Sequence, residues 1–107
     1  MIHPREIEVL NILFKSENAL TSTDIIESGN RLSQSTVQAV LRKLLKEGLV
    51  AVEGVTHSGN VLSRTYRPTE AARKAIKQQY IEGYKSIMNI VPVKELLEEF
   101  KEMVGDQ

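Results

Sequence analysis

The sequence contains no cysteine and no tryptophan, and only two of its 107 residues are histidine. Without cysteine the chain can form no disulfide, no thiolate metal site and no thiol redox switch. His3 and His57 have no pattern of carboxylates around them that indicates a metal site. The chain also lacks a glycine-rich phosphate loop and a credible arrangement of nucleophile, base and acid. We therefore expect a protein that is not an enzyme and that binds no metal and no cofactor.

Long apolar stretches are missing as well. No apolar run reaches the length of a membrane-spanning helix, and the chain does not open with a signal-peptide pattern. An apolar fraction of 41% and a charged fraction of 26% are typical of a folded globular protein. We expect a cytoplasmic protein without membrane contact, built as one compact domain or as a small domain with an oligomerisation arm.

The chain has no excess of either charge, because 14 cations balance 14 anions. The charges are unevenly distributed along the sequence, however. Residues 31–69 hold six cations against two anions, a net charge of +4, whereas residues 1–30 carry a net charge of −3. A basic middle segment between acidic flanks indicates a nucleic-acid-binding surface, although a solvated face could have this composition by chance.

Apolar periodicity and capping residues predict three helices in the first half of the chain. The first covers about residues 4–17, the second is short and covers residues 21–27, and the third covers residues 32–48. Ser33 is a favourable N-cap for the third helix, and Gly48 is suited to the left-handed position after its end. A helix, a short helix, a turn and a longer helix follow one another in a helix-turn-helix unit.

The third predicted helix has an apolar stripe on one side and a polar, basic face on the other. Hydroxyls and amides near its N-terminus, followed by cations, suit a helix that reads base edges and contacts phosphates. An ordinary amphipathic surface helix is the alternative. The residues expected to meet the major groove are Ser35, Thr36, Gln38, Ala39 and Arg42.

After Gly48 the sequence changes to the pattern of β-strands. Short strands at residues 49–52 and 61–66, with a polar turn around residues 57–60, predict a β-hairpin. A basic hairpin directly after a recognition helix is expected to act as a wing that contacts phosphates or the minor groove, whereas a purely structural hairpin is the alternative. The residues expected to position the DNA backbone are Ser33, Gln34, Lys43, Lys46, Arg64 and Arg67.

Two further amphipathic helices are predicted after Thr69, with Pro92 between them. A small winged domain cannot cover the apolar stripes of these two helices. Burial of the stripes against a second copy of the chain is the simplest solution. The alternative is that the two helices fold back onto their own winged domain. We therefore expect a winged-helix DNA-binding domain at residues 1–68 and a helical dimerisation arm at residues 69–107. The expected dimerisation residues are Ile76, Tyr80, Tyr84, Ile87, Leu96, Leu97, Phe100 and Met103.

Three segments, Arg5–Ile26, Leu32–Val37 and Leu41–Val50, resemble the penicillinase-repressor family. The resemblance covers most of the chain. It implies a winged helix-turn-helix with a small C-terminal helical dimerisation domain, acting as a homodimeric repressor on a palindromic operator. It also implies release by a sensor protease that cleaves after an Asn preceding an aromatic residue. The nearest candidate here is Asn89–Ile90, in which the aromatic residue is missing.

The segment Tyr66–Glu70 also resembles the wing exit of the multiple-antibiotic-resistance and phenolic-acid regulators. That resemblance implies a regulator that responds to a small molecule. Tyr80, Tyr84 and Met88 are candidates to line an effector pocket between the arm and the winged domain, and ordinary core positions are the alternative. A winged-helix module that binds another protein is a further alternative, although the polar, basic helix face favours double-stranded DNA. Taken together, the sequence predicts a mainly α fold with a small β-hairpin and a sequence-specific DNA-binding transcriptional regulator.

Overall fold

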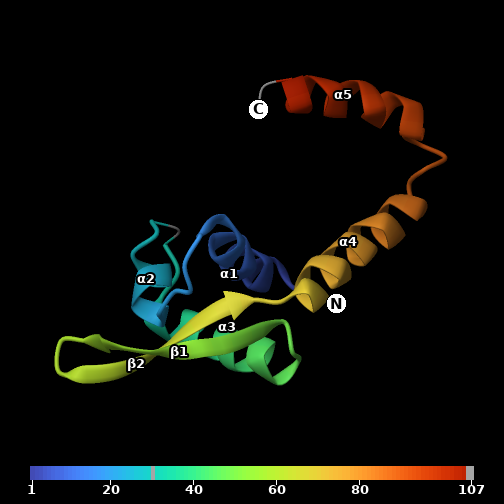
Figure 1. Cartoon of the computed structure of the whole chain (residues 1–107). Helices are drawn as coiled ribbons and strands as arrows, with labels where there is room; N and C mark the ends of the chain where they lie inside the picture. The colour runs from blue at the N-terminus through green and yellow to red at the C-terminus, as the bar shows by residue number, and fades with distance from the viewer. Residues whose placement is uncertain (30, 106–107) are drawn as a thin grey trace. The chain divides into compact units, whose positions relative to one another are not determined.

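The computed structural model describes residues 1–29 and 31–105 (Figure 1). Within these residues the chain is mainly helical with one antiparallel β-hairpin, which confirms the predicted fold class. Its contacts divide it into two compact units, Met1–Ile76 and Lys77–Gln107. The elements in chain order are α1 (Pro4–Lys15), α2 (Ser22–Ile26), α3 (Gln34–Lys46), β1 (Val50–Ser58), β2 (Val61–Pro68), α4 (Glu70–Lys85) and α5 (Val93–Gly105).

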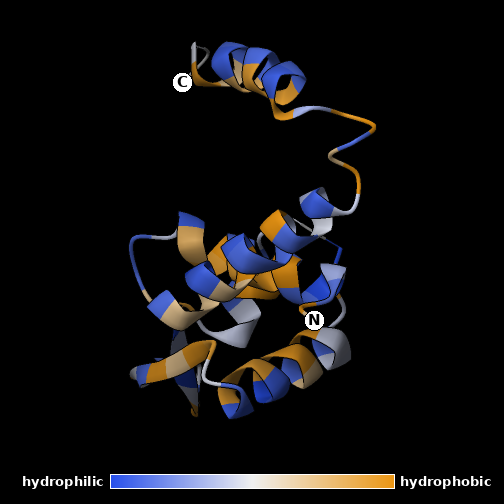
Figure 2. Cartoon of the chain, turned by 90° about the vertical axis from the view of Figure 1, so that its right-hand side faces the viewer, coloured by the Kyte–Doolittle hydropathy of each residue, from blue (hydrophilic) through white to orange (hydrophobic). Residues whose placement is uncertain are grey.

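The first unit is organised around one apolar core to which α1, α2 and α3 each contribute a buried side. In Figure 2 the helices of this unit carry hydrophobic residues on one side and hydrophilic residues on the other. The stripe that α3 buries is the one its helical spacing predicts, with Leu45 only half-buried at its edge. The core residues of α3 are Val37, Val40, Leu41 and Leu44.

Local capping interactions explain where α2 and α3 begin and where α3 ends. The Thr21 hydroxyl accepts from the Asp24 N–H at 3.1 Å, and the Asp24 carboxylate accepts from the Thr21 N–H at 2.9 Å. This reciprocal capping box satisfies two backbone donors at the start of α2. At the start of α3 the Ser33 hydroxyl accepts from the Thr36 N–H at 3.1 Å. Gly48 follows α3 with a φ of +75°, a left-handed conformation that glycine adopts without a steric penalty.

The wing is longer than the sequence predicts. Strands β1 and β2 pair without a long loop, from Val50 opposite Pro68 to Ser58 opposite Val61. Gly59, with a φ of +67°, begins the two-residue connection, as expected for a tight hairpin turn. The prediction that the first strand ends at residue 52 is wrong, because a bulge between Val52 and Gly54 lets pairing continue. The outer part of β1 is exposed, so its sequence lacks the apolar alternation that marks a half-buried strand.

The start of α4 belongs to the winged unit. The Thr69 hydroxyl donates to the Gly48 carbonyl at 2.8 Å and accepts from the Ala72 N–H at 3.2 Å. Ala72 is fully buried, and Ala75 and Ile76 pack against the same core. The first unit therefore extends to Ile76, beyond the boundary expected at residue 68.

The second unit consists of the remainder of α4 and of α5. The Tyr84 hydroxyl donates to the Val91 carbonyl at 2.8 Å and so links the end of α4 to the segment before α5. None of the described residues 77–105 is buried. Across both units, none of the described helices combines the length and the apolar content needed to span a bilayer.

Candidate nucleic-acid interface

Helix α3 presents a continuous polar face to solvent. Because its core stripe is buried against α1 and α2, the side chains on the opposite side of the helix are exposed. Among them, Gln38 and Arg42 carry the groups best suited to recognise base edges. The exposed residues of this face are Ser35, Gln38, Ala39, Arg42 and Lys46.

The N-terminal end of α3 is fixed by a small cluster of hydroxyls. The Ser33 hydroxyl donates to the Thr36 hydroxyl at 2.8 Å, and the Ser35 hydroxyl lies 3.2 Å from that of Ser33. Thr36 is half-buried, whereas Ser33, Gln34 and Ser35 are exposed. Because backbone N–H groups at a helix N-terminus attract anions, this end of α3 is suited to a phosphate contact.

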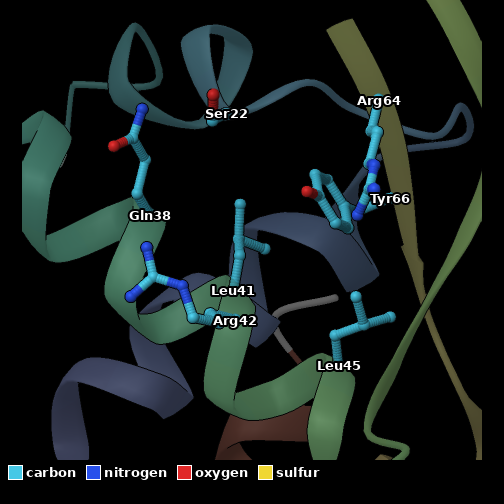
Figure 3. Close-up of a pocket in the computed structure, with 7 residues that line it drawn as sticks. All are labelled: Ser22, Gln38, Leu41, Arg42, Leu45, Arg64 and Tyr66. Carbon is cyan, nitrogen blue, oxygen red and sulfur yellow. The ribbon is translucent and has the colours of Figure 1, made fainter.

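Helix α3 and the wing are the two walls of one open groove, which has a volume of about 320 Å³. Figure 3 shows Gln38 and Arg42 on α3 and Arg64 and Tyr66 on β2, with Leu41 and Leu45 between the two elements and with the Arg42 guanidinium extending away from Arg64. Ser22 of α2 completes the lining. The groove therefore combines an amide, hydroxyls and two guanidinium groups, all of which can donate hydrogen bonds to nucleic acid.

The two wing arginines do not lie on the same face of the hairpin. Arg64 is paired opposite Val55, and Arg67 is paired opposite Ala51. Side chains alternate along a strand, so residues three positions apart point to opposite faces, and the bulge lies on β1 rather than on β2. Only Arg64 lines the groove with Arg42, while Arg67 is exposed on the other face.

The cations of this surface differ in their surroundings. Over residues 1–29 and 31–105, no carboxylate lies within 4.0 Å of the charged groups of Arg42, Lys46, Arg64 or Arg67. Lys43 is different, because its ammonium lies 2.8 Å from the Glu6 carboxylate and 4.0 Å from that of Glu47. Unpaired cations are available to DNA phosphates, whereas a paired cation must first give up its partner.

Glu6 is a buried carboxylate that pairs with Lys43 at the margin of this surface. The sequence did not reveal this pairing. The Glu6 side chain is only 6% exposed, and it accepts from the His3 N–H at 2.9 Å as well as from Lys43. Burial raises the pKa of Glu6, but the hydrogen bonds from Lys43 and His3 outweigh that effect and leave the pKa below its ordinary value. The hydrogen bond to Glu6 in turn raises the pKa of Lys43. No sequence motif connects α1 to α3, so only the fold could reveal this pair.

The expected dimerisation residues fall into two environments. Ile76 packs against the core of the winged unit, while the other members belong to the second unit. There Phe100 is 49% exposed, and Tyr84 and Leu96 are half-buried. An almost wholly apolar groove of about 520 Å³ runs between the α4 and α5 segments. Its lining residues are Lys77, Tyr80, Ile81, Tyr84, Val93, Leu96 and Phe100.

The sequence matches the family model described as penicillinase repressor over residues 2–103, which is nearly the whole chain. The chain belongs to the penicillinase repressor family. Members of this family are transcription regulators rather than enzymes, so the protein is a DNA-binding transcriptional regulator. Among the described residues no cluster of histidines and carboxylates could hold a metal ion. A search of curated proteins gives no match.

Solved structures of other regulators share the fold of this penicillinase-repressor-family chain. A MepR mutant from a multidrug-resistant S. aureus clinical isolate has a TM-score of 0.62 at 17% identity, covering 98% of this chain and 78% of that one. A PadR family regulator from Clostridium difficile has a TM-score of 0.57 at 20% identity, with coverages of 81% and 96%. Bacillus subtilis PadR in complex with operator DNA has a TM-score of 0.58 at 20% identity, with coverages of 76% and 49%. These likenesses confirm the winged-helix fold.

Proposed function

We propose that the protein is a homodimeric repressor that binds a palindromic operator with α3 in the major groove and the wing on the flanking backbone. The observation that carries the proposal is the groove between α3 and β2, whose lining includes Arg42 and Arg64, two guanidinium groups that have no carboxylate within 4.0 Å among the described residues. A surface of donors and free cations fits the acceptor-rich base edges and the phosphates of DNA.

Within this proposal the exposed face of α3 reads sequence. Gln38 can form paired hydrogen bonds with adenine, and Arg42 can do so with guanine, while Ala39 can contact a thymine methyl group. Ser35 and Thr36 complete the proposed base-reading set, with Thr36 restrained by its hydrogen bonds to Ser33. The side chains proposed to bind the DNA backbone are Ser33, Gln34, Lys46, Arg64 and Arg67, and Lys43 is considered separately below.

The second unit supplies the proposed dimer contact. Its apolar side chains are not buried within a single chain, and a surface of this kind is costly in water. A two-fold dimer would cover these side chains and would present two α3 helices to two half-sites about one helical turn apart. Because such a protein acts where the chromosome is, we place it in the cytoplasm.

Two kinds of partner are candidates for releasing the repressor. A sensor protease could reach Asn89, which is exposed in the turn between α4 and α5. A small apolar effector could enter the groove beside Tyr80 and Tyr84, whereas Met88, which is 49% exposed, does not line that groove. Each route would act on the second unit and would therefore weaken the proposed dimer.

Selection of bound fragments from genomic DNA tests the proposal directly. We expect the enriched fragments to share an inverted repeat whose half-sites are separated by about 10 base pairs, with two chains bound to each duplex. A variant that carries both Arg42→Ala and Arg64→Ala serves as the control and should enrich no common sequence. Enrichment of a single half-site that binds one chain would contradict the dimeric operator complex.

A further inference from the structure

The Glu6 carboxylate connects the first turn of α1 to the margin of the recognition helix. One of its oxygens, Oε1, accepts from the His3 N–H at 2.9 Å, and the other, Oε2, lies 2.8 Å from the Lys43 ammonium. Both oxygens are therefore engaged in a group that is almost completely buried. The carboxylate cannot turn away from Lys43 without also uncapping α1.

We propose that Glu6 and Lys43 form a positioning pair that fixes the rotation of α3 on the core, and that Lys43 does not itself contact DNA. This inference rests on the proposed function of α3 as the base-reading helix. It assigns Lys43 a different role from the phosphate contact expected from its sequence position.

The packing of α3 explains why a positioning pair is needed. Its buried stripe consists of aliphatic side chains, whose contacts are non-directional and tolerate small rotations of the helix. Successive residues are separated by about 100° around a helix, so any rotation that moves Lys43 also moves Arg42, the next side chain. A short hydrogen bond between charged groups depends on direction and therefore restricts that rotation.

The surroundings of Lys43 argue against a direct role in DNA binding. Its ammonium faces two carboxylates, whereas no described carboxylate lies within 4.0 Å of the charged groups of Arg42 and Lys46 on the same helix. If Lys43 turned to a phosphate, the Glu6 carboxylate would remain buried without its charged partner, which is unfavourable. On this helix the phosphate contact, and the counterion release that accompanies it, should therefore come from Lys46 rather than from Lys43.

The test compares Lys43→Met with Lys46→Met, each of which removes one cation from the same helix. Affinities for a selected operator duplex and for a scrambled duplex are measured over a salt series. Lys46→Met should reduce the slope of log affinity against log salt by about 0.9, the value for one lost phosphate contact. Lys43→Met should leave that slope unchanged and reduce the preference for operator by about tenfold, the size of one misplaced base contact. Lys43→Arg should restore the preference.

Two results would overturn the positioning pair alone. In the first, Lys43→Met reduces the salt slope as much as Lys46→Met, which makes Lys43 a phosphate contact. In the second, the preference for operator is unchanged, which makes the pair a purely structural one. A wild-type protein without any preference for operator would instead overturn the proposed function and this inference together.

A second variant keeps the proposal testable if Lys43→Met does not fold. Glu6→Gln keeps an oxygen that can accept from the His3 N–H but removes the negative charge that faces Lys43. We expect the same loss of operator preference from Glu6→Gln as from Lys43→Met. If both variants fold, the double variant should lose no more than either single variant, because both remove one interaction. Additive losses would contradict the pair.

Discussion

Arg42 is the residue whose surroundings bear most directly on DNA binding. It follows the buried Leu41, lies on the exposed side of α3 and lines the same groove as Arg64 (Figure 3). Because its guanidinium has no ion-pair partner among the described residues, its removal should leave the fold intact.

We predict that Arg42→Ala lowers operator affinity by about 1–3 kcal/mol and changes the free energy of unfolding by no more than about 0.5 kcal/mol. The measurements are operator binding and denaturant unfolding, with Lys15→Ala of α1 as the control that loses an exposed cation away from α3. If Arg42→Ala loses stability as well as affinity, the exposed face of α3 has been assigned incorrectly.

The ion pair of Glu6 should make the free energy of unfolding depend on pH. The pKa of Glu6 is lower in the folded chain than the ordinary value of 4.5, so the charged carboxylate stabilises the fold fully above that value. This contribution should disappear as the pH falls through the folded pKa. At pH 7 Glu6→Gln should cost about 1–3 kcal/mol, and the difference from wild type should shrink as the solution becomes acidic. Denaturant unfolding between neutral and acidic pH measures this difference, and parallel profiles for the two proteins would contradict the ion pair.

At the scale of elements, the helices could be predicted because their signals are local. The Ser33 cap, the left-handed Gly48 and the stripe on α3 each depend on residues within a few positions of one another. The length of the wing could not be predicted, since Gly54 and its polar neighbours resemble a turn until the bulge is known. The ion pair between Glu6 and Lys43 could not be predicted either, because it joins two helices that are distant in sequence. By contrast, the opposite orientation of Arg64 and Arg67 follows from strand alternation and could have been predicted.

Gly48 provides a test of how α3 ends. Its φ of +75° is unfavourable for a side chain, while a Cβ built at this position would meet no atom within 4 Å. Gly48→Ala should therefore lower the free energy of unfolding by about 1–2 kcal/mol through backbone strain alone. Gly48→Asn should cost less, because asparagine tolerates the left-handed conformation better. Denaturant midpoints measure both variants, and an alanine variant as stable as wild type would contradict the left-handed end of the helix.

At the scale of the whole molecule, the two units make separable contributions. The first unit contains α3, the wing and the start of α4, where Thr69 bonds to Gly48 and Ala72 fills the core. Over its described residues 77–105, the second unit contains exposed apolar side chains and no buried residue. We therefore propose DNA contact for the first unit and self-association for the second.

We predict that a chain ending at Ile76 is a folded monomer with much weaker operator affinity than the full chain, because only one half-site is contacted at a time. A chain ending at Pro68 should be less stable, since it loses the Thr69 hydrogen bonds and buried Ala72. Light scattering, thermal unfolding and operator binding distinguish these results. If the chain ending at Ile76 remains a dimer, the proposed role of the second unit is wrong.

We propose that this chain, which has no net charge, binds its operator through a basic surface formed by α3 and the wing. The most direct test is the affinity of the full-length wild-type protein for operator and scrambled duplexes over a series of salt concentrations. We predict that log affinity falls linearly with log salt, with a slope of about −0.9 for each phosphate contacted, and that operator is preferred throughout. Absence of duplex binding at low salt, or equal binding of the two duplexes, would contradict the account.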